Sequence, residues 1–439
     1  MRDLTLPSSP TFWRSPVRGT RFTSLLGLAL LVGIPVVFAT GLLSYAAYNP
    51  DLSPVNDQTP DKGLLGGYLF PWPTDPHWLY RLTQGVHVTL GITLVPVLLA
   101  KLWSVIPRLF AVPPARTLAR ALERLSLLAL VGGGLFVFAT GILNIQLDYL
   151  FPGSFYRLHF YGAWVFVAAL ALHVALRLPA ALRAVRRRGG PPEGGADSGA
   201  SDPGASDPGA SDAGASDAPR PAAPTTSRRG ALWFVGAGSL LLLGTTAGRS
   251  FDGPLRATAL LAPHGWAEPG DGPGGFQINK TAASVGVTPE ETAAEVWRLA
   301  LVGPAGTVRL SRSDLAALPQ HTAALPIACV EGWSTSDQRW RGVRLRDLAG
   351  LAGHEEGSVP DVLVTSLQRS GAFRRAALRA NQVADPRSLL ALEVNGAPLT
   401  PDHGFPARVI VPAAPGVLNT KWVARMEFRQ LSARDGGDR

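Results

Sequence analysis

Four long apolar runs constrain the fold of this chain more than any other feature of its sequence. A helix needs roughly 20 consecutive apolar residues to cross a bilayer. Runs of about that length extend over approximately residues 22–45, 79–103, 125–145 and 155–178. Hydrophobic residues make up 46% of the 439 positions. We therefore expect a multi-domain protein with an all-α transmembrane bundle over residues 22–188.

The basic residues are concentrated on one side of these runs. The formal net charge is +9, which in a soluble protein would suggest a nucleic-acid partner. Here the arginines and lysines lie before the first run, between the second and third, and after the fourth, whereas the other two loops carry mainly aspartates. Positive charge beside membrane helices is typical of their cytoplasmic ends. The sequence thus predicts a multi-pass cell-membrane protein with residues 1–21 in the cytoplasm and no nucleic-acid partner.

The four runs form two related pairs. The stretch "VFATGLLSY" in the first run returns as "VFATGILNI" in the third, and "LYRL" at the start of the second returns as "FYRL" at the start of the fourth. Two helical hairpins of related sequence predict a four-helix bundle with a pseudo-twofold arrangement. The alternative is that helices rich in Leu, Val and Gly resemble one another by chance.

A low-complexity segment, residues 189–227, follows the bundle. Its repeated "GASD" units contain no bulky apolar side chain, so we expect a disordered linker. A fifth apolar segment over residues 228–248 comes next, and Ser227, Arg228 and Arg229 at its start resemble a twin-arginine export signal. On this interpretation the fifth segment is a retained transmembrane helix, and the chain beyond it is extracytoplasmic.

The rest of the chain has a different character. A connector, residues 249–274, leads to short β-rich runs that alternate with Gly, Pro and Asp turns over residues 275–431. This pattern predicts an α+β domain. The domain contains Cys329, the only cysteine of the chain, in the stretch "CVEGWS". A single thiol can form neither an intramolecular disulfide nor a cysteine-rich zinc site.

The motifs around Cys329 resemble those of the sulfite oxidase superfamily. They are "CVEGWS", "WRGVRLRDL" and "LALEVNGAPLTPDHGFPARVIVPAAPGVLNTKWVARMEF", in that order. The resemblance implies a molybdopterin-binding oxidoreductase domain in which the catalytic Cys329 thiolate binds molybdenum. A soft thiolate suits a metal that cycles between oxidation states. The alternative is that Cys329 is merely a small buried hydrophobic residue.

The same resemblance assigns further residues to the cofactor. Each stands at a position where the family contacts the pterin or its phosphate: Asn279, Thr365, His403, Arg408 and Lys421. A phosphate also requires cationic donors and backbone amides, and the glycine-containing loop over residues 416–420 is a candidate for these. The alternative role of Arg408 is that of a solvent-exposed residue on an edge strand.

The substrate stays open because the domain departs from sulfite oxidases proper. These enzymes place several arginines around their oxyanion substrate, and here only Arg339 and Lys280 come near such a role. The domain looks closer to the catalytic subunit of periplasmic methionine sulfoxide reductase. The resemblance therefore implies a small oxygen donor or acceptor, such as a sulfoxide or sulfite.

Two histidines in the apolar runs suggest a route for electrons. His87 in the second run and His159 in the fourth lie at similar depth when counted from the shared "YRL". The bundle resembles membrane cytochrome b subunits that serve exported molybdoenzymes, so both histidines are candidate ligands of one b-type haem. A second haem at His173 would lack a depth-matched histidine, because Val97 stands there. A hydrogen bond between helices is the alternative role for these side chains.

Together these patterns predict a membrane-anchored, extracytoplasmic molybdopterin-dependent oxidoreductase. Its expected partners are a small-molecule substrate, the lipid bilayer, and a membrane electron donor or acceptor such as a quinone or cytochrome. Two other functions remain open on the sequence. One is a non-catalytic membrane protein that uses the pterin-type fold as a binding module, which would not need the Cys329 thiolate. The other is a haem electron carrier whose exported domain serves for docking.

Overall fold

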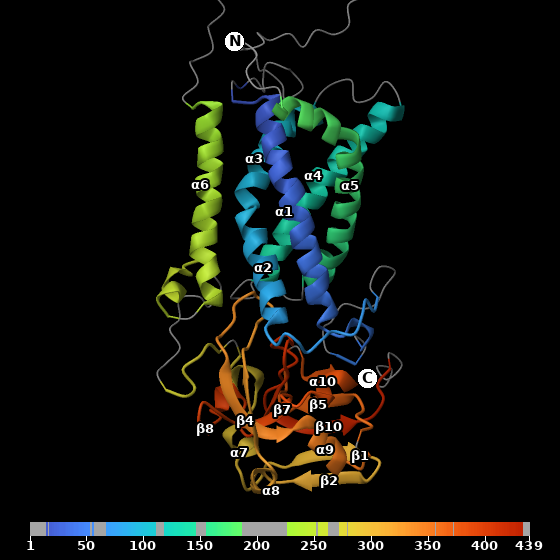
Figure 1. Ribbon diagram of the computed structural model, residues 1–439, viewed down its shortest axis with the longest axis vertical. Coiled ribbons are helices and arrows are strands. Elements are labelled where there is room, and N and C mark those ends of the chain that lie inside the picture. The colour runs from blue at the N-terminus through green and yellow to red at the C-terminus, as the bar shows by residue number, and fades with distance from the viewer. Residues whose placement is uncertain are drawn as a thin grey trace, which may run out of the picture.

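The protein has a helical part and a mixed α/β part, arranged end to end in a computed structural model (Figure 1). The structure describes residues 15, 17–52, 55–56, 67–110, 118–145, 155–186, 226–251, 253–261, 272–278, 280–355, 357–371 and 373–432. Asn279, one of the predicted pterin contacts, lies outside the described residues, as does most of the predicted linker.

The helical part consists of long helices that lie side by side (Figure 1). They are α1 (Thr20–Ala46), α2 (Leu79–Thr93), α3 (Val95–Leu109), α4 (Leu118–Asn144), α5 (Tyr156–Arg186) and α6 (Arg228–Ala247). Among the described residues, four helical stretches are long and apolar enough to cross a membrane, namely Thr20–Ala46, Arg124–Asn144, Tyr156–Ala175 and Arg228–Ser250. The bent pair α2 and α3 would make a fifth if it is one span. Large apolar side chains are exposed along them, including Val32, Leu128, Val165 and Phe234. A membrane would cover these side chains, whereas water would leave them unfavourably exposed.

The second apolar run is not one straight helix, which corrects the prediction of a single helix over residues 79–103. The helices α2 and α3 meet at Leu94 with a bend of 41°. Pro96 lies in the first turn of α3, where its ring removes one backbone donor and would clash with the carbonyl four residues earlier. Pro35 lies inside α1 without interrupting it. A proline alone therefore does not determine where a helix breaks.

The helices pack so that the two related hairpins face each other. The helix α1 packs against α2, α3 and α5, while α4 packs against α5, and α6 packs on the outside against α2 and α3. The buried centre is apolar and consists of Leu30, Ile34, Leu94, Leu98, Val137 and Phe166. Close approach requires glycine in places, because a Cβ at Gly33 would lie 2.7 Å from a methyl carbon of Leu94.

The α/β part contains two five-stranded sheets. The first has the order β2 (Gly306–Leu310), β1 (Leu299–Gly303), β10 (Val423–Phe428), β5 (Val362–Ser366) and β6 (Arg375–Leu378). The second has the order β3 (His321–Leu325), β4 (Gln338–Arg344), β7 (Leu389–Val394) and β8 (Ala397–Pro398), and β9 (Arg408–Ile410) also pairs with β7. All pairs are antiparallel except β1 with β10. Short helices join them: α7 (Pro289–Thr292), α8 (Arg312–Ala317), α9 (Leu345–Leu351) and α10 (Ala380–Ala384).

Strand β7 separates the two hydrophobic cores of this domain. Because side chains alternate along a strand, Leu390 and Leu392 face the larger core, which includes residues of the first sheet. Leu389 and Ala391 face the opposite way, into a smaller core that contains Cys329. The predicted α+β fold of the C-terminal domain is confirmed, and its second sheet provides the platform on which the Cys329 site is built.

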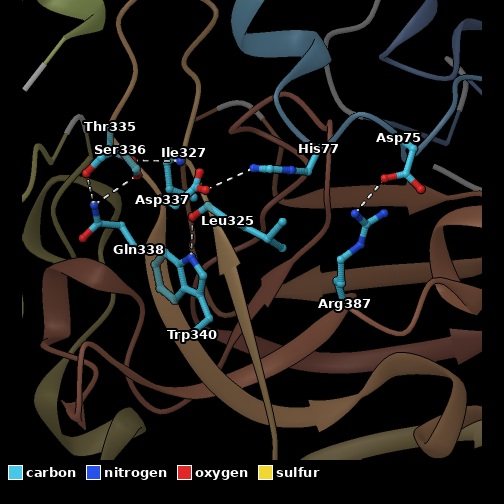
Figure 2. Close-up of polar contacts among 10 residues, drawn as sticks. All are labelled: Asp75, His77, Leu325, Ile327, Thr335, Ser336, Asp337, Gln338, Trp340 and Arg387. Carbon is cyan, nitrogen blue, oxygen red and sulfur yellow. Dashed lines mark hydrogen bonds and ion pairs between the residues drawn. The ribbon is translucent and has the colours of Figure 1, made fainter.

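The two parts of the protein share a buried interface. Tyr48, Trp72 and Tyr80 of the helical part pack in one apolar cluster with Ala328, the residue before Cys329. The Trp72 indole N–H donates to the carbonyl oxygen of Ala413 at 2.7 Å. Polar contacts at the rim join His77 to Asp337 at 3.1 Å and Arg387 to Asp75 at 2.8 Å (Figure 2). The Cys329 region therefore faces the helical part.

Candidate functional site

Cys329 lies in a tight turn between β3 and β4. Its backbone N–H donates to the carbonyl of Trp333 at 2.9 Å, and the N–H of Gly332 donates back to the Cys329 carbonyl at 3.0 Å. Gly332 has φ of +88°, a conformation that glycine adopts without strain. The Trp333 indole donates to the Glu331 carboxylate at 3.0 Å. The sequence "CVEGW" thus supplies a turn that holds the thiol in one place.

The strands on both sides of the turn hold it further (Figure 2). The Trp340 indole N–H on β4 donates to the Leu325 carbonyl at 3.0 Å, and the Ile327 N–H donates to the Thr335 hydroxyl at 3.0 Å. From another loop, the Gly416 N–H donates to the Ala328 carbonyl at 2.7 Å. Cys329 itself is only 3% exposed. Its sulfur is therefore held on a rigid frame rather than on a free loop.

A pocket beside Cys329 collects the predicted cationic residues. Lys280, Arg408 and Lys421 line it together with Asn419 and Thr420. The Lys421 ammonium group donates to the carbonyls of Asp402 at 2.7 Å and Lys280 at 2.8 Å. Arg408 is 4% exposed, so its alternative role as a solvent-exposed edge-strand residue is wrong. The loop over residues 416–420 contributes side chains as well as backbone to this pocket.

The electrostatics of the pocket favour an anion. Burial lowers the pKa of Arg408 to about 9. Burial, followed by the charges of Arg408 and Lys421, lowers the pKa of His403 to about 3, so its imidazole is neutral near pH 7. Burial and the charges of Arg408 and Lys280 also lower the pKa of Lys421 well below its usual value. Cations that depress one another's pKa are relieved when a negative group binds among them.

Several buried polar atoms at this pocket have no hydrogen-bond partner among the described residues. They are Arg408 Nε, Asn419 Nδ2 and Thr420 Oγ1. His403 Nε2 is also without a partner, but His403 does not line the pocket and packs against Phe276 instead. Unsatisfied buried donors are costly, at about 1–3 kcal/mol each, and native proteins rarely keep them. A polar, anionic molecule in the pocket would satisfy them. The cations and donors present therefore fit an anionic group such as the phosphate of a pterin, and Cys329 beside them is the candidate ligand to its metal.

Not every predicted site residue reaches the pocket. Thr365 lies in β5, paired with Arg425 and Arg375, and it does not line this pocket, so its assignment as a pterin contact stays a prediction. The loose alignment at that point missed Gln368, which does line the pocket and accepts from Lys280 at 3.4 Å. Of the two cationic candidates for substrate binding, Lys280 lines the pocket, whereas Arg339 on β4 does not.

A second and larger cavity lies between the helices and extends to Cys329. Its volume is about 740 Å³, in the range of small-molecule and cofactor sites. The helices α1, α2, α4 and α5 all contribute to its wall, and His87 and His159 face it. Lys280, Cys329 and Glu331 line the same cavity from the α/β part. One continuous space therefore connects the two sites that the sequence indicated separately.

The geometry of the two histidines fits a shared iron. Their ring centroids are 6.0 Å apart with planes at 85°. Two imidazoles on one metal, each nitrogen about 2 Å from it, would place their centroids roughly 6 Å apart. His87 Nδ1 donates to the Val37 carbonyl at 2.8 Å, and His159 Nδ1 donates to the Val137 carbonyl at 3.0 Å. These bonds select the tautomer whose Nε2 can act as a ligand.

The internal repeat explains why both histidines are held alike. The valines that accept their hydrogen bonds are the equivalent first residues of the two "VFATG" stretches. The equivalent glycines make room for the rings. A Cβ at Gly41 would lie 2.8 Å from His87 Cε1, and one at Gly141 would lie 3.0 Å from His159 Cε1. The repeat thus preserves the support of an imidazole as well as helix packing.

The sequence analysis missed residues that reach Cys329 from the helical part. Tyr48 and Tyr80 pack beside it, and Arg249, fully buried just beyond α6, donates to the Thr89 hydroxyl on α2 at 3.1 Å. The Gln84 side-chain amide on α2 donates to the Val330 carbonyl. No sequence motif marks these residues, because their role depends on how the two parts dock.

The fold and the pocket agree with comparisons to known proteins. Residues 285–435 match the family described as the oxidoreductase molybdopterin binding domain. The C-terminal part of the chain is thus a molybdopterin-binding oxidoreductase domain of the sulfite oxidase type. The prediction of a molybdopterin-binding oxidoreductase domain in this part of the chain is confirmed.

Individual relatives match the same region. The mitochondrial sulfite oxidase of Rattus norvegicus is 34% identical over 157 residues, which cover 30% of this chain and 29% of that protein. An uncharacterized oxidoreductase of Bacillus subtilis, YuiH, is 34% identical over 133 residues, which cover 30% of this chain and 65% of its own. The solved sulfane dehydrogenase SoxCD of Paracoccus pantotrophus aligns over 32% of this chain and 40% of its own, with 21% identity and a TM-score of 0.29. The chain therefore spans less than two thirds of each of these relatives.

Proposed function

We propose that the protein is a membrane-anchored, extracytoplasmic molybdopterin-dependent oxidoreductase that exchanges electrons with the membrane. The observation that carries the proposal is the pocket beside Cys329, where buried cations and unsatisfied donors surround the only thiol of the chain. Small oxygen donors or acceptors, such as a sulfoxide or sulfite, are the proposed substrates. Several relatives are named sulfite oxidases, which supports sulfite as a candidate.

The residues of the pocket divide the work of holding the cofactor. The Cys329 thiolate would bind molybdenum, and the bound group would supply two-electron redox chemistry beside that sulfur. Arg408 and Lys421 would neutralise the phosphate, and Asn419 and Thr420 would donate hydrogen bonds from their unsatisfied atoms. His403 is held through its Nδ1 by the Thr400 hydroxyl at 2.9 Å, and it does not line the pocket, so its contact with the pterin stays a prediction.

Electrons are proposed to reach the membrane through the helical part of the same chain. His87 and His159 would hold one b-type haem, which supplies one-electron transfer. The continuous cavity between these histidines and Cys329 supports a transfer within one chain. A quinone or cytochrome in the membrane is then the proposed donor or acceptor. The two alternatives, a non-catalytic binding module and a haem carrier with a docking domain, leave the unsatisfied polar atoms or the buried thiol unexplained.

Cofactor loading is expected to depend on Arg408. Hydrogen bonds to charged groups contribute about 1.5–3 kcal/mol, so Arg408→Leu should reduce the molybdenum and pterin content of membrane-extracted protein by roughly 10- to 100-fold. Elemental analysis and pterin fluorescence measure both. Arg408→Lys should lose less cofactor than Arg408→Leu, because it keeps a positive charge. The control Arg341→Leu, an exposed change on β4, leaves the pocket intact and should keep the cofactor content of the wild type. Wild-type protein without molybdenum would refute the proposed function.

The membrane orientation is expected to follow the arginines. A reporter that works only outside the cytoplasm should be active when it is fused after Leu431. A reporter that works only in the cytoplasm should be active when it is fused before α1. Changing Arg228 and Arg229 to Lys should abolish export of the C-terminal domain if these residues form a twin-arginine signal. Unchanged export of the double variant would refute that signal alone, whereas reversed reporters would refute the orientation.

A further inference from the structure

The large cavity is lined at Cys329 by a residue of the helical part that the pterin assignment does not use. Tyr48 follows the end of α1 and lines this cavity together with Cys329, Val330 and Phe373. It is 4% exposed and packs in one cluster with Ala328, Val330 and Phe373. Ala328 and Val330, the two sequence neighbours of Cys329, thus pack in the same cluster as Tyr48.

Tyr48 is paired with a second tyrosine. Its hydroxyl lies 3.2 Å from the hydroxyl of Tyr80 at the start of α2, and either group can donate. In the described part of the chain, neither hydroxyl has another hydrogen-bond partner. Two hydroxyls carry two hydrogens, and their mutual bond uses one of them. One O–H therefore remains to be donated elsewhere.

The position of the pair indicates where that hydrogen points. Tyr48 lines the cavity, whereas Tyr80 does not, so when Tyr80 donates to Tyr48 the remaining O–H belongs to the residue that lines the cavity. The charge of Cys329 is among the causes that raise the pKa of Tyr48, after burial and the neighbouring tyrosines. The charge of Cys329 also contributes to raising the pKa of Tyr80, so both hydroxyls stay protonated near pH 7. A buried O–H beside a redox-active sulfur is suited to hold an oxygen atom of a small molecule.

We propose that Tyr48 is a substrate-binding residue contributed by the helical part, so that the active site at Cys329 is composite. Its hydroxyl donates a hydrogen bond to the oxygen of a small acceptor, such as a sulfoxide or sulfite oxygen, while Tyr80 orients it. The inference rests on the proposed function, because the substrate is taken to react at the metal on Cys329. It adds that the C-terminal domain without the helical part lacks one side of its substrate site.

The test compares full-length Tyr48→Phe, Tyr80→Phe and wild-type protein, with Tyr161→Phe as the matched control. Tyr161 lies on α5 and does not line the cavity. With dimethyl sulfoxide or sulfite as probe and a dye as electron partner, kcat/KM of Tyr48→Phe should fall about tenfold, as expected for one lost hydrogen bond. Tyr80→Phe should fall less, because it only orients Tyr48. Tyr161→Phe should match the wild type.

A spectroscopic measurement separates this role from a merely structural one. The electron paramagnetic resonance signal of molybdenum(V) should change in Tyr48→Phe, including its response to exchange of H₂O for D₂O, and should be unchanged in Tyr161→Phe. Molybdenum content is measured on the same samples. Full molybdenum with unchanged resonance and kcat/KM in Tyr48→Phe would overturn the inference alone. Wild-type protein that contains no molybdenum would overturn the proposed function and the inference together.

Discussion

Replacement of Cys329 by serine is expected to abolish dye-linked oxidoreductase activity and to remove most of the molybdenum, while the domain stays folded. The serine hydroxyl is a hard and weakly acidic donor, so it does not replace a thiolate as ligand to a metal that changes oxidation state. The change is nearly isosteric in a turn held by its own backbone hydrogen bonds. Activity, elemental analysis and thermal unfolding of the purified protein measure the three parts of this expectation.

A second substitution at the same position controls for the buried hydroxyl. Cys329→Ala leaves no polar atom behind, so loss of molybdenum in both variants assigns the effect to the thiolate. The unfolding temperature of both variants should stay close to that of wild-type protein stripped of its cofactor, because bound cofactor stabilises the folded state of the wild type. Full activity in Cys329→Ser would contradict the assignment of this residue as the metal ligand.

The second large effect is expected in the helical part. Dithionite-reduced membranes that contain the overproduced wild-type protein should show the sharp visible bands of a low-spin b-type haem. The bands should vanish in His87→Leu and in His159→Leu, because each removes one of two imidazole ligands. His173→Leu is the control, since His173 lies on the same helix as His159 but does not line the cavity.

The glycines behind the two rings allow a finer test of the same site. Gly141→Ala should displace the His159 ring and shift or weaken the bands, because the added carbon would lie 3.0 Å from Cε1. Gly132→Ala on the same helix meets nothing within 4 Å and should leave them unchanged. A wild-type protein that binds no haem would contradict the proposed electron route. The assignment of Cys329 would survive, because it depends on residues of the other domain.

The sequence by itself determined the features that depend on residues close together along the chain. Apolar runs of membrane length are long helices in the structure, because their burial requires little more than hydrophobicity and helix-forming residues. The stretch "CVEGW" predicted a special site, and its glycine, tryptophan and glutamate are explained by the turn that they build. Arg408 and Lys421 were predicted from their motifs, and both line the pocket beside Cys329, since each lies in a strand or loop of the same domain.

The sequence is least informative where neighbouring residues decide the outcome. Thr365 lies within β5 and does not line the pocket, whereas Gln368, just beyond the strand end, does. The second apolar run was predicted as one helix, yet it bends by 41° at Leu94 beside Pro96, while Pro35 leaves α1 continuous. In both cases the decisive factor is packing and hydrogen bonding around the residue, which the residue itself does not encode.

Only the tertiary structure shows that residues of both domains line one cavity. Tyr48, Tyr80 and Arg249 carry no motif, and they lie far from Cys329 along the chain, so no local pattern could have selected them. Their roles arise because the α/β domain docks on the ends of α1 and α2 through a shared apolar cluster. The sequence thus predicted a chemistry for each domain from its thiol or its paired histidines. The docking decided that both face one cavity, because long-range contacts between domains depend on complementary surfaces rather than on spacing along the chain.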